Sequence, residues 1–191
     1  MRRTLPLVAL AATLALAGCT SKDPGPDLPP SDQSTATTTP TKEVDPRRAA
    51  ERAAIQRLKD YHTASNQLGH GGYDPDDIST MTSFTAGDYS KTFFDQVAWL
   101  SSQGAVLVGA SVQTDYKVVD HHAVTSDFYD DQLTIEVCND TTNVDIVLSD
   151  GSSVMSSKGK GRFIATVTMW HSIDQDMWRI AQYITDGGRP C

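Results

Sequence analysis

The chain has 191 residues, of which 24 are acidic and 16 are basic, and its formal net charge at pH 7 is −8. An acidic surface disfavours nucleic acid as a partner and disfavours direct adsorption to anionic lipid. The length is sufficient for one domain with a proper hydrophobic core, and no internal repeat is visible.

The first elements along the chain are those of a signal peptide. Arg2 and Arg3 precede an apolar run over residues 5–17, which is 13 residues long, whereas a membrane-spanning helix needs about 20. The next letters, "LAGC" at 16–19, resemble the lipobox of bacterial lipoproteins, whose cysteine is alkylated with diacylglycerol and becomes the new N-terminus. The sequence therefore predicts a lipoprotein signal peptide over residues 1–18 and lipidation at Cys19. The alternative is an ordinary secretory signal with an incidental cysteine.

Lipidation at Cys19 would decide where the protein resides. Two acyl chains contribute about 0.8 kcal/mol per buried methylene, which is enough to hold a protein durably on a membrane. We therefore expect the membrane to be a partner, through diacylglycerol on Cys19, with the chain on the extracytoplasmic face.

Residues 19–44 have the composition of a tether. Six of the nine prolines fall between positions 24 and 46, among many serines and threonines. A segment with so few large aliphatic side chains cannot bury enough apolar area to offset its ordering entropy. We expect a lipidated cysteine followed by a disordered Pro/Thr-rich spacer, and a folded domain over residues 45–191.

The three cysteines form an odd count. Assigning Cys19 to the lipid leaves Cys138 and Cys191, and outside the cytoplasm such a pair tends to oxidise. A disulfide between them would stabilise the fold by about 4 kcal/mol in the chain-entropy model. The alternative is two free thiols.

Helical signals occupy the first half of the domain. Asp45 and Pro46 are typical of a helix start, and Asp74 and Pro75 repeat the signal. The first run continues to the glycines at 69, 71 and 72. A third helix is predicted in "GDYSKTFFDQVAWLSSQG" at 87–104, with Phe93 on its apolar face.

Strand signals follow residue 104. Apolar residues alternate over 110–119 and over 131–138, and Asp150-Gly151 is a hairpin signal. Two β-rich runs at 161–172 and 177–185 are separated by a short polar loop, which predicts a closing hairpin. Three helices followed by a strongly bent antiparallel sheet make an α+β domain.

The closing hairpin, "TVTMWHSIDQDMWRIAQYI" at 166–184, resembles that of the NTF2-like superfamily, also called SnoaL-like. With "VCND" at 137–140 and "GGRPC" at 187–191, the chain is similar to actinobacterial lipoproteins of unknown function that carry such a domain. The resemblance covers residues 45–191 and implies an NTF2-like cone, with N-terminal helices packed on a strongly curved antiparallel sheet. These motifs concern structure and carry no chemistry.

The segment "DHHAVTSDFYDD" at 120–131 concentrates imidazoles and carboxylates, which suit divalent metals. Adjacent histidines on a strand point to opposite faces, so His121 and His122 cannot both chelate without a bend. We expect a solvated inter-strand loop here, with no metal and no cofactor.

Enzymes of the NTF2-like fold often use a carboxylate or similar base inside the cone. The candidates are His62, Asp115 and His171, with Tyr61 and Tyr116 nearby in sequence, and two histidines facing the cone would form a proton-transfer pair. No catalytic set of the family matches residue by residue. Buried, hydrogen-bonded or surface histidines are therefore the favoured interpretation, and no catalytic residue is assigned.

Aromatic side chains supply either a core or the lining of an apolar pocket. The candidates are Phe93, Trp99, Trp170 and Trp178, of which we assign Trp178 to packing.

Three functions remain open. The leading hypothesis is a non-catalytic, membrane-anchored binding or accessory module for an envelope protein or a small apolar ligand. The alternatives are an enzyme, such as an isomerase, dehydratase or hydrolase, and an immunity lipoprotein of phages or prophages.

Overall fold

The structure of the protein is a computed structural model, and it describes residues 45–155, 159–185 and 189–191. The predicted signal peptide (1–18), the lipidation site Cys19 and the predicted tether (19–44) lie outside the described residues. No helix among the described residues is long and apolar enough to cross a membrane.

The three predicted helices are present, and two of them begin at the predicted caps. The side chain of Asp45 accepts a hydrogen bond from a backbone N–H two residues later at 3.0 Å, and Asp74 does the same at 2.9 Å. Each cap satisfies an amide that the helix itself leaves unpaired. The helices are α1 (Pro46–His70), α2 (Pro75–Met81) and α3 (Gly87–Ser102).

The strands form two antiparallel sheets, which confirms the α+β class. The larger sheet has the order β2-β3-β5-β6 and is not closed, so β2 and β6 are its two edges; the smaller sheet pairs β1 with β4. The strands are β1 (Val106–Val108), β2 (Val112–Ala123), β3 (Tyr129–Asp140), β4 (Asp145–Val147), β5 (Arg162–Ser172) and β6 (Met177–Thr185).

The segment predicted to be a solvated loop is mostly strand, so that prediction was wrong. Strand β2 continues through His121 and His122 and pairs with β3 up to Ala123 opposite Asp131. In the sequence, the alternation of apolar and polar residues stops before the end of this strand. The reason is that β2 contains two register irregularities, which shift its side chains from one face of the sheet to the other. Only residues 124–128 connect the strands.

The hairpin predicted at Asp150-Gly151 is only partly correct. A turn does form, because the Gly151 N–H donates to the Leu148 carbonyl at 2.9 Å. Beyond it, however, a single bridge joins Val147 to Ser153. Strand β4 pairs with β1 instead, a strand that the sequence did not predict. The closing hairpin of β5 and β6 is confirmed.

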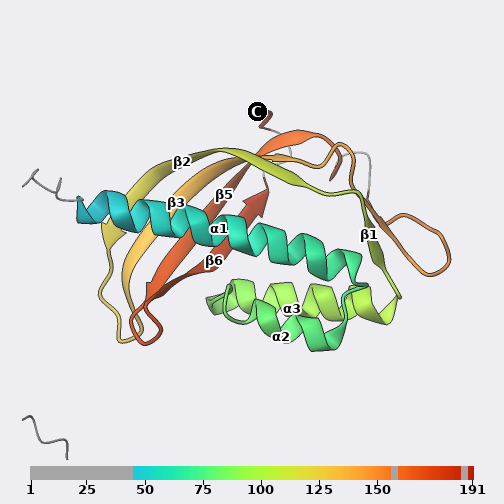
Figure 1. The fold of residues 1–191 in the computed structure, drawn as a ribbon, viewed down its shortest axis with the longest axis horizontal. Helices are drawn as coiled ribbons and strands as arrows, with labels where there is room; N and C mark the ends of the chain where they lie inside the picture. The colour runs from blue at the N-terminus through green and yellow to red at the C-terminus, as the bar shows by residue number, and fades with distance from the viewer. Residues whose placement is uncertain (1–44, 156–158, 186–188) are drawn as a thin grey trace, which may run out of the picture. The chain divides into compact units, whose positions relative to one another are not determined.

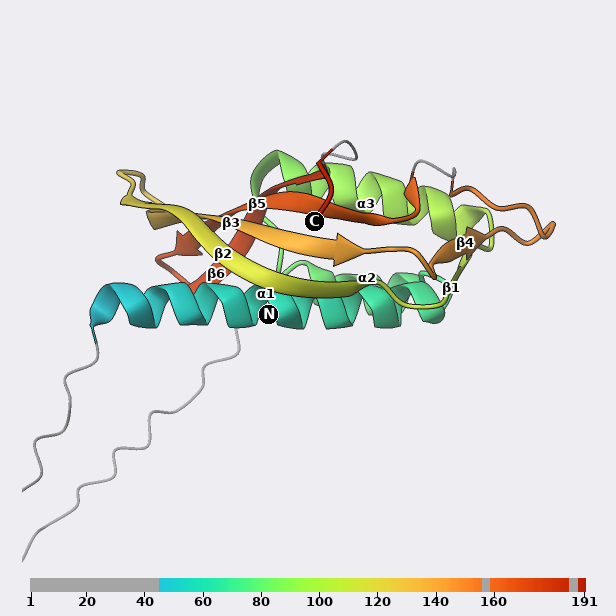
Figure 2. The same ribbon diagram turned by 90° about the horizontal axis from the view of Figure 1, so that it is seen from above.

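One face of the large sheet and the apolar faces of the helices form the core. Figures 1 and 2 show α1 alongside β2 and α3 against β6, in agreement with the contacts between these elements. Along the two central strands, β3 and β5, every second side chain is buried on this face, as expected for a sheet buried on one side. The strand residues that belong to this core are Leu133, Ile135, Val137, Ala165, Val167, Met169, Trp178 and Ile180.

A disulfide joins Cys138 of β3 to Cys191, as the cysteine count predicted. Cys138 alternates with the buried core residues, so it lies on the other face of the sheet. Two contacts reinforce the bond there: Arg189 pairs with Glu136 at 2.9 Å, and the Arg189 carbonyl accepts from the Ile164 N–H at 2.9 Å. The final residues are thus held against β3 and β5.

Candidate functional site

The space between the helices and the large sheet is filled by packed aromatic rings. The hydroxyls of Tyr61 and Tyr89 are 2.6 Å apart, and the Tyr183 hydroxyl accepts a hydrogen bond from the amide of Gln113 at 2.8 Å. Burial raises the pKa of Tyr89 to about 12 and raises the pKa of Tyr61 and of Tyr183 as well. These tyrosines are therefore neutral hydrogen-bonding groups at physiological pH.

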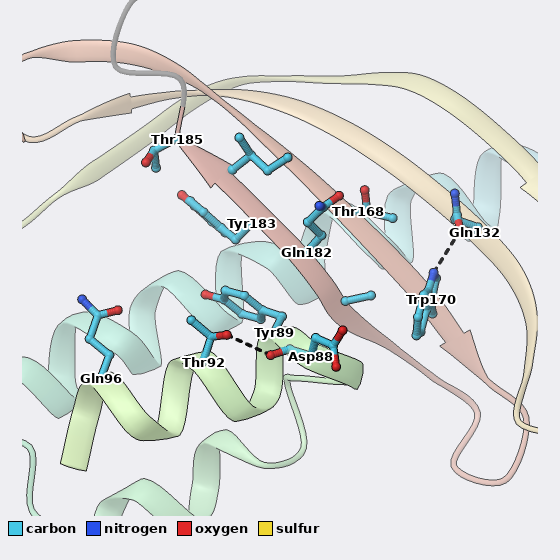
Figure 3. A pocket seen from close by; sticks show the side chains of 12 residues that line it. Asp88, Tyr89, Thr92, Gln96, Gln132, Thr168, Trp170, Gln182, Tyr183 and Thr185 are labelled. Atoms are coloured by element: carbon cyan, nitrogen blue, oxygen red, sulfur yellow. Dashed lines mark hydrogen bonds between the residues drawn. The ribbon is translucent and has the colours of Figure 1, made fainter. Parts of the chain in front are cut away.

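A groove of about 860 Å³ lies on the side where α3 packs against β6 (Figure 3). Seven of its twelve lining residues are amides, hydroxyls or a carboxylate, and three are aromatic. We call this hollow the groove. Its lining residues are Asp88, Tyr89, Thr92, Gln96, Gln132, Thr168, Trp170, Ala181, Gln182, Tyr183, Ile184 and Thr185.

Trp170 is held in place at one end of the groove. Its indole N–H donates to the side-chain oxygen of Gln132 at 2.9 Å, and its ring lies 4.9 Å from that of Tyr129. Gly87 at the start of α3 has φ 56°, and a Cβ there would approach the indole to 3.3 Å. Glycine is thus needed where α3 begins beside Trp170.

Several polar side chains of the groove have no hydrogen-bond partner among the described residues. Among the described residues, no side-chain hydrogen bond is made by Asp88, Gln96, Thr168 or Gln182. Of these four, Asp88, Gln96 and Gln182 are exposed to solvent. The groove therefore presents free donors and acceptors to solvent.

Strand β6 forms one wall of the groove, and some hydrogen-bonding groups of its backbone are already paired with the segment between α2 and α3. The N–H of Ile180 donates to the Phe84 carbonyl at 2.7 Å, and the Ile180 carbonyl accepts from the Ala86 N–H at 2.8 Å. The next residue, Ala181, lies at a register irregularity between β5 and β6. This edge is thus blocked at one point and bent at the next.

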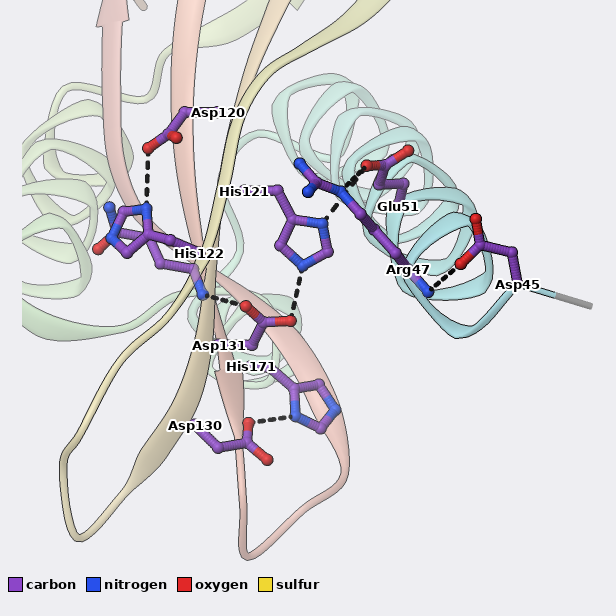
Figure 4. A network of polar contacts seen from close by, with 10 residues as sticks. Asp45, Arg47, Glu51, Asp120, His121, His122, Asp130, Asp131 and His171 are labelled. Carbon is purple, nitrogen blue, oxygen red and sulfur yellow. Dashed lines mark hydrogen bonds and ion pairs between the residues drawn. The ribbon is translucent and has the colours of Figure 1, made fainter.

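A second polar region lies where α1 begins beside the strands (Figure 4). His121 is 8% exposed and lies between two carboxylates, with Nδ1 3.4 Å from Glu51 and Nε2 2.7 Å from Asp131. His171 contacts two other carboxylates, and its ring lies 5.2 Å from that of Trp178. We call this group the histidine cluster; it comprises Glu51, His121, Asp130, Asp131, His171 and Asp176.

Every histidine and carboxylate of the histidine cluster is paired. Glu51 also accepts from Arg47 at 3.1 Å, and this hydrogen bond, followed by the one from His121, lowers the Glu51 pKa against the opposing effect of burial. Within the described residues, no group of three or more His, Cys, Asp or Glu is arranged to hold a metal ion. The cluster joins α1 to three strands.

His62 lies in a separate hollow of about 430 Å³ between α1 and β2. Its Nε2 is 2.8 Å from the hydroxyl of Ser111, which itself donates to the Asn66 oxygen at 3.1 Å. Burial lowers the pKa of His62, so the imidazole is neutral. In the part of the chain that is described, no carboxylate orients this imidazole, and the Ser111 proton is directed to Asn66. The contact braces α1 against β2 rather than activating the serine.

The three sequence candidates for catalysis are not brought together. His62 contacts Ser111, His171 contacts Asp130, and Asp115 is exposed and accepts only from the adjacent Thr114 at 2.9 Å. The three share no hydrogen-bond partner among the described residues. Two further candidates, Tyr61 and Tyr116, belong to the aromatic core and its margin.

The aromatic candidates divide three ways. Phe93 and Trp178 are 8% and 4% exposed and belong to the core, whereas Trp170 lines the groove. Trp99 is 50% exposed and lies neither in the core nor in the groove, so its assignment as core or pocket was wrong. Helix α3 buries Phe93, Val97 and Leu100. Since each residue of a helix is turned by about 100° from the one before, Trp99 is turned about 200° from Val97 and therefore lies on the solvent side.

Sequence reasoning missed most of the groove. Gln96, Gln132 and Gln182 carry no motif and look like ordinary surface residues. The available signal was indirect. Gln182 interrupts the apolar pattern of β6, the strand that the sequence predicted to form a hairpin with the strand of Trp170.

Comparisons with known proteins add no family. No protein-family model and no curated protein matches the chain. Among solved structures, the intermembrane-space region of the chloroplast protein ARC6 aligns with a TM-score of 0.37 at 12% identity, over 75% of this chain and 97% of that one. A de novo β-sheet design aligns with a TM-score of 0.24 at 17% identity, over 74% of this chain and 88% of the design. Likenesses at this level carry no argument about function.

Proposed function

We propose that the protein is a lipid-anchored, extracytoplasmic binding module that uses the groove to hold its ligand. The observation that carries the proposal is the contrast between a filled interior and an open groove. Packed tyrosine and phenylalanine rings occupy the space where an enzyme of this shape would need a cavity, whereas the groove has room for a ligand.

The anchor and the location rest on the sequence. The lipobox at 16–19 and the spacer that follows it favour attachment through diacylglycerol on Cys19. A disulfide at Cys138 and Cys191 suits an oxidising compartment. Replacing Cys19 with alanine should release the protein from the membrane fraction and remove the diacylglycerol mass from its N-terminus.

The finer assignment of the fold is part of the proposal. An NTF2-like cone is favoured by three helices that precede a curved antiparallel sheet and by the β5–β6 hairpin. The similarity to actinobacterial lipoproteins belongs with it, since both rest on the same motifs.

The binding role is tested by photo-crosslinking in living cells. The full-length lipoprotein is made with benzoylphenylalanine in place of Gln182 in the groove or in place of Gln67, an exposed amide on α1. The proposal predicts an adduct of defined mass from position 182 and not from position 67. Equal yields at both positions, or none at either, would contradict it.

A further inference from the structure

The charges around the groove narrow the class of ligand that it can take. The lining contains one carboxylate, Asp88, and no lysine, arginine or histidine. A phosphate or another anion would find no cation there and would meet a protein with a net charge of −8. A polycation would find a single exposed carboxylate. An uncharged ligand fits this lining best.

The amides of the groove match a ligand rich in hydroxyls. A glutamine side chain both donates and accepts, and so does a hydroxyl group, so each amide can pair with neighbouring hydroxyls in either direction. Gln96 on α3 and Gln182 on β6 both line the groove, at separate places and from different elements, and neither has a hydrogen-bond partner among the described side chains. Thr168 adds a hydroxyl on β5.

The aromatic residues supply a surface for the apolar face of a ring. Trp170 is fixed by its bond to Gln132, so its indole does not have to be ordered when a ligand arrives. Tyr89 and Tyr183 lie nearly parallel, with ring centres 6.2 Å apart, and their hydroxyls are bonded within the protein. Their rings therefore contribute contact area without unpaired hydroxyls.

We infer that the groove binds a neutral oligosaccharide, whose hydroxyls pair with Gln96 and Gln182 and whose ring stacks on Trp170. This inference rests on the proposed function. A hollow of about 860 Å³ has the size of a site for a drug-sized molecule, which corresponds to a short stretch of sugar units.

A peptide is the main competitor, and the backbone of β6 argues against it. A peptide strand would add to a free, regular edge. Here both hydrogen-bonding groups of Ile180 are taken by Phe84 and Ala86, and the irregularity at Ala181 bends the edge. Side-chain recognition of a sugar needs no such edge.

The test uses the full-length chain in a detergent without a sugar headgroup. Maltotriose, cellotriose, mannotriose and triacetylchitotriose are titrated by calorimetry, with inorganic phosphate and an Ala-Gln-Thr-Ala peptide in parallel. At least one trisaccharide should bind with a dissociation constant in the millimolar range or tighter, and neither phosphate nor the peptide should bind. Sedimentation with cellulose and chitin powders then shows whether the same sugars are bound in polymer form.

Three variants in the groove and one control variant on α1 locate the binding site. Gln96→Ala and Gln182→Ala should each weaken trisaccharide binding about threefold to tenfold, because each removes hydrogen bonds to the sugar. Gln67→Ala, the matched control on α1, should change nothing. Trp170→Phe keeps an aromatic ring for stacking but loses the bond to Gln132, and it should weaken binding at least as much as either amide variant.

Two results would overturn the inference: no saturable binding of any of the four trisaccharides, or binding that is unchanged in both amide variants. Binding of the peptide alone would do the same and would point to a protein ligand. If crosslinking from position 182 still exceeds that from position 67 in cells, the groove remains the binding site and only the sugar assignment fails.

Discussion

The histidine cluster and the groove are both polar, but their polar groups are satisfied in different ways. In the histidine cluster, His121 is nearly buried and bonds two carboxylates from different elements. In the groove, Gln96 and Gln182 are exposed and make no side-chain hydrogen bond among the described residues. The polar groups of the first region are paired inside the protein, whereas these two amides of the second are turned to solvent.

This difference separates structural from functional polarity. A polar group that is paired inside the fold contributes to stability, and removing its partner leaves an unsatisfied group that costs free energy. A polar group that faces solvent contributes little to stability and is available to a ligand. We therefore assign a structural role to the histidine cluster, although it is rich in groups that suit catalysis, and we propose the groove as the recognition site.

The largest expected effect on stability comes from the disulfide. Its contribution to the free energy of unfolding is the reference with which the contributions of the two polar regions are compared. A double variant, Cys138→Ser with Cys191→Ser, should lower the free energy of unfolding by about 4 kcal/mol, because it releases the constraint on the unfolded chain. Urea denaturation of the oxidised wild-type protein and the variant measures the difference. A change below about 1 kcal/mol would show that the tie contributes little.

The next effect tests the histidine cluster directly. His121→Ala should cost about 1–3 kcal/mol, because it leaves Glu51 and Asp131 without the imidazole that they share. His122 is the matched control: it is the adjacent residue, its side chain is 48% exposed, and His122→Ala should cost less than about 0.5 kcal/mol. If urea denaturation gave the same loss of unfolding free energy for His121→Ala and His122→Ala, the structural role of the cluster would be contradicted.

The pH dependence of stability provides a third test, at the brace between α1 and β2. Because burial lowers the pKa of His62, the unfolded chain takes up a proton at a higher pH than the folded one. The contribution of His62 is therefore complete above about pH 6.5 and is lost as pH falls through the lower, folded-state pKa. His62→Gln should flatten this part of a plot of unfolding free energy against pH. An unchanged slope in the variant would contradict this assignment.

The smallest effect on stability is expected in the groove. Gln182→Ala removes an exposed side chain and should change the free energy of unfolding by less than about 0.5 kcal/mol, while weakening trisaccharide binding. Thermal unfolding and calorimetry on the same sample measure both quantities. A large loss of stability would place Gln182 among the structural polar groups instead.

The sequence predicted the parts of the fold that depend on local chemistry. Asp45 and Asp74 cap helices because their short carboxylates reach amides two residues away. The closing hairpin follows from two alternating runs around a polar turn. The opposite faces of His121 and His122 follow from the period of a strand, and their burial differs accordingly.

Features that depend on distant pairing were not predictable in this way. Strand β2 extends through His121 only because β3 pairs with it there, and its irregularities hide the alternation. The groove is formed by α3, β5 and β6 together, and amides such as Gln96 and Gln182 give no local signal of a site. The wrong assignment of Trp99 has a different cause. Its exposure was predictable from the sequence, because the helical period of α3 turns Trp99 away from Val97.

Hydrogen–deuterium exchange on the full-length protein, with and without the trisaccharide that binds best, tests the central claim most directly. The account predicts slower exchange of backbone amides along α3 from Asp88 to Gln96 and in the last residues of β6, where Gln182 lies, and no change around His62 or His121. Protection confined to the hollow beside His62 or to the histidine cluster, with α3 and β6 unchanged, would contradict it.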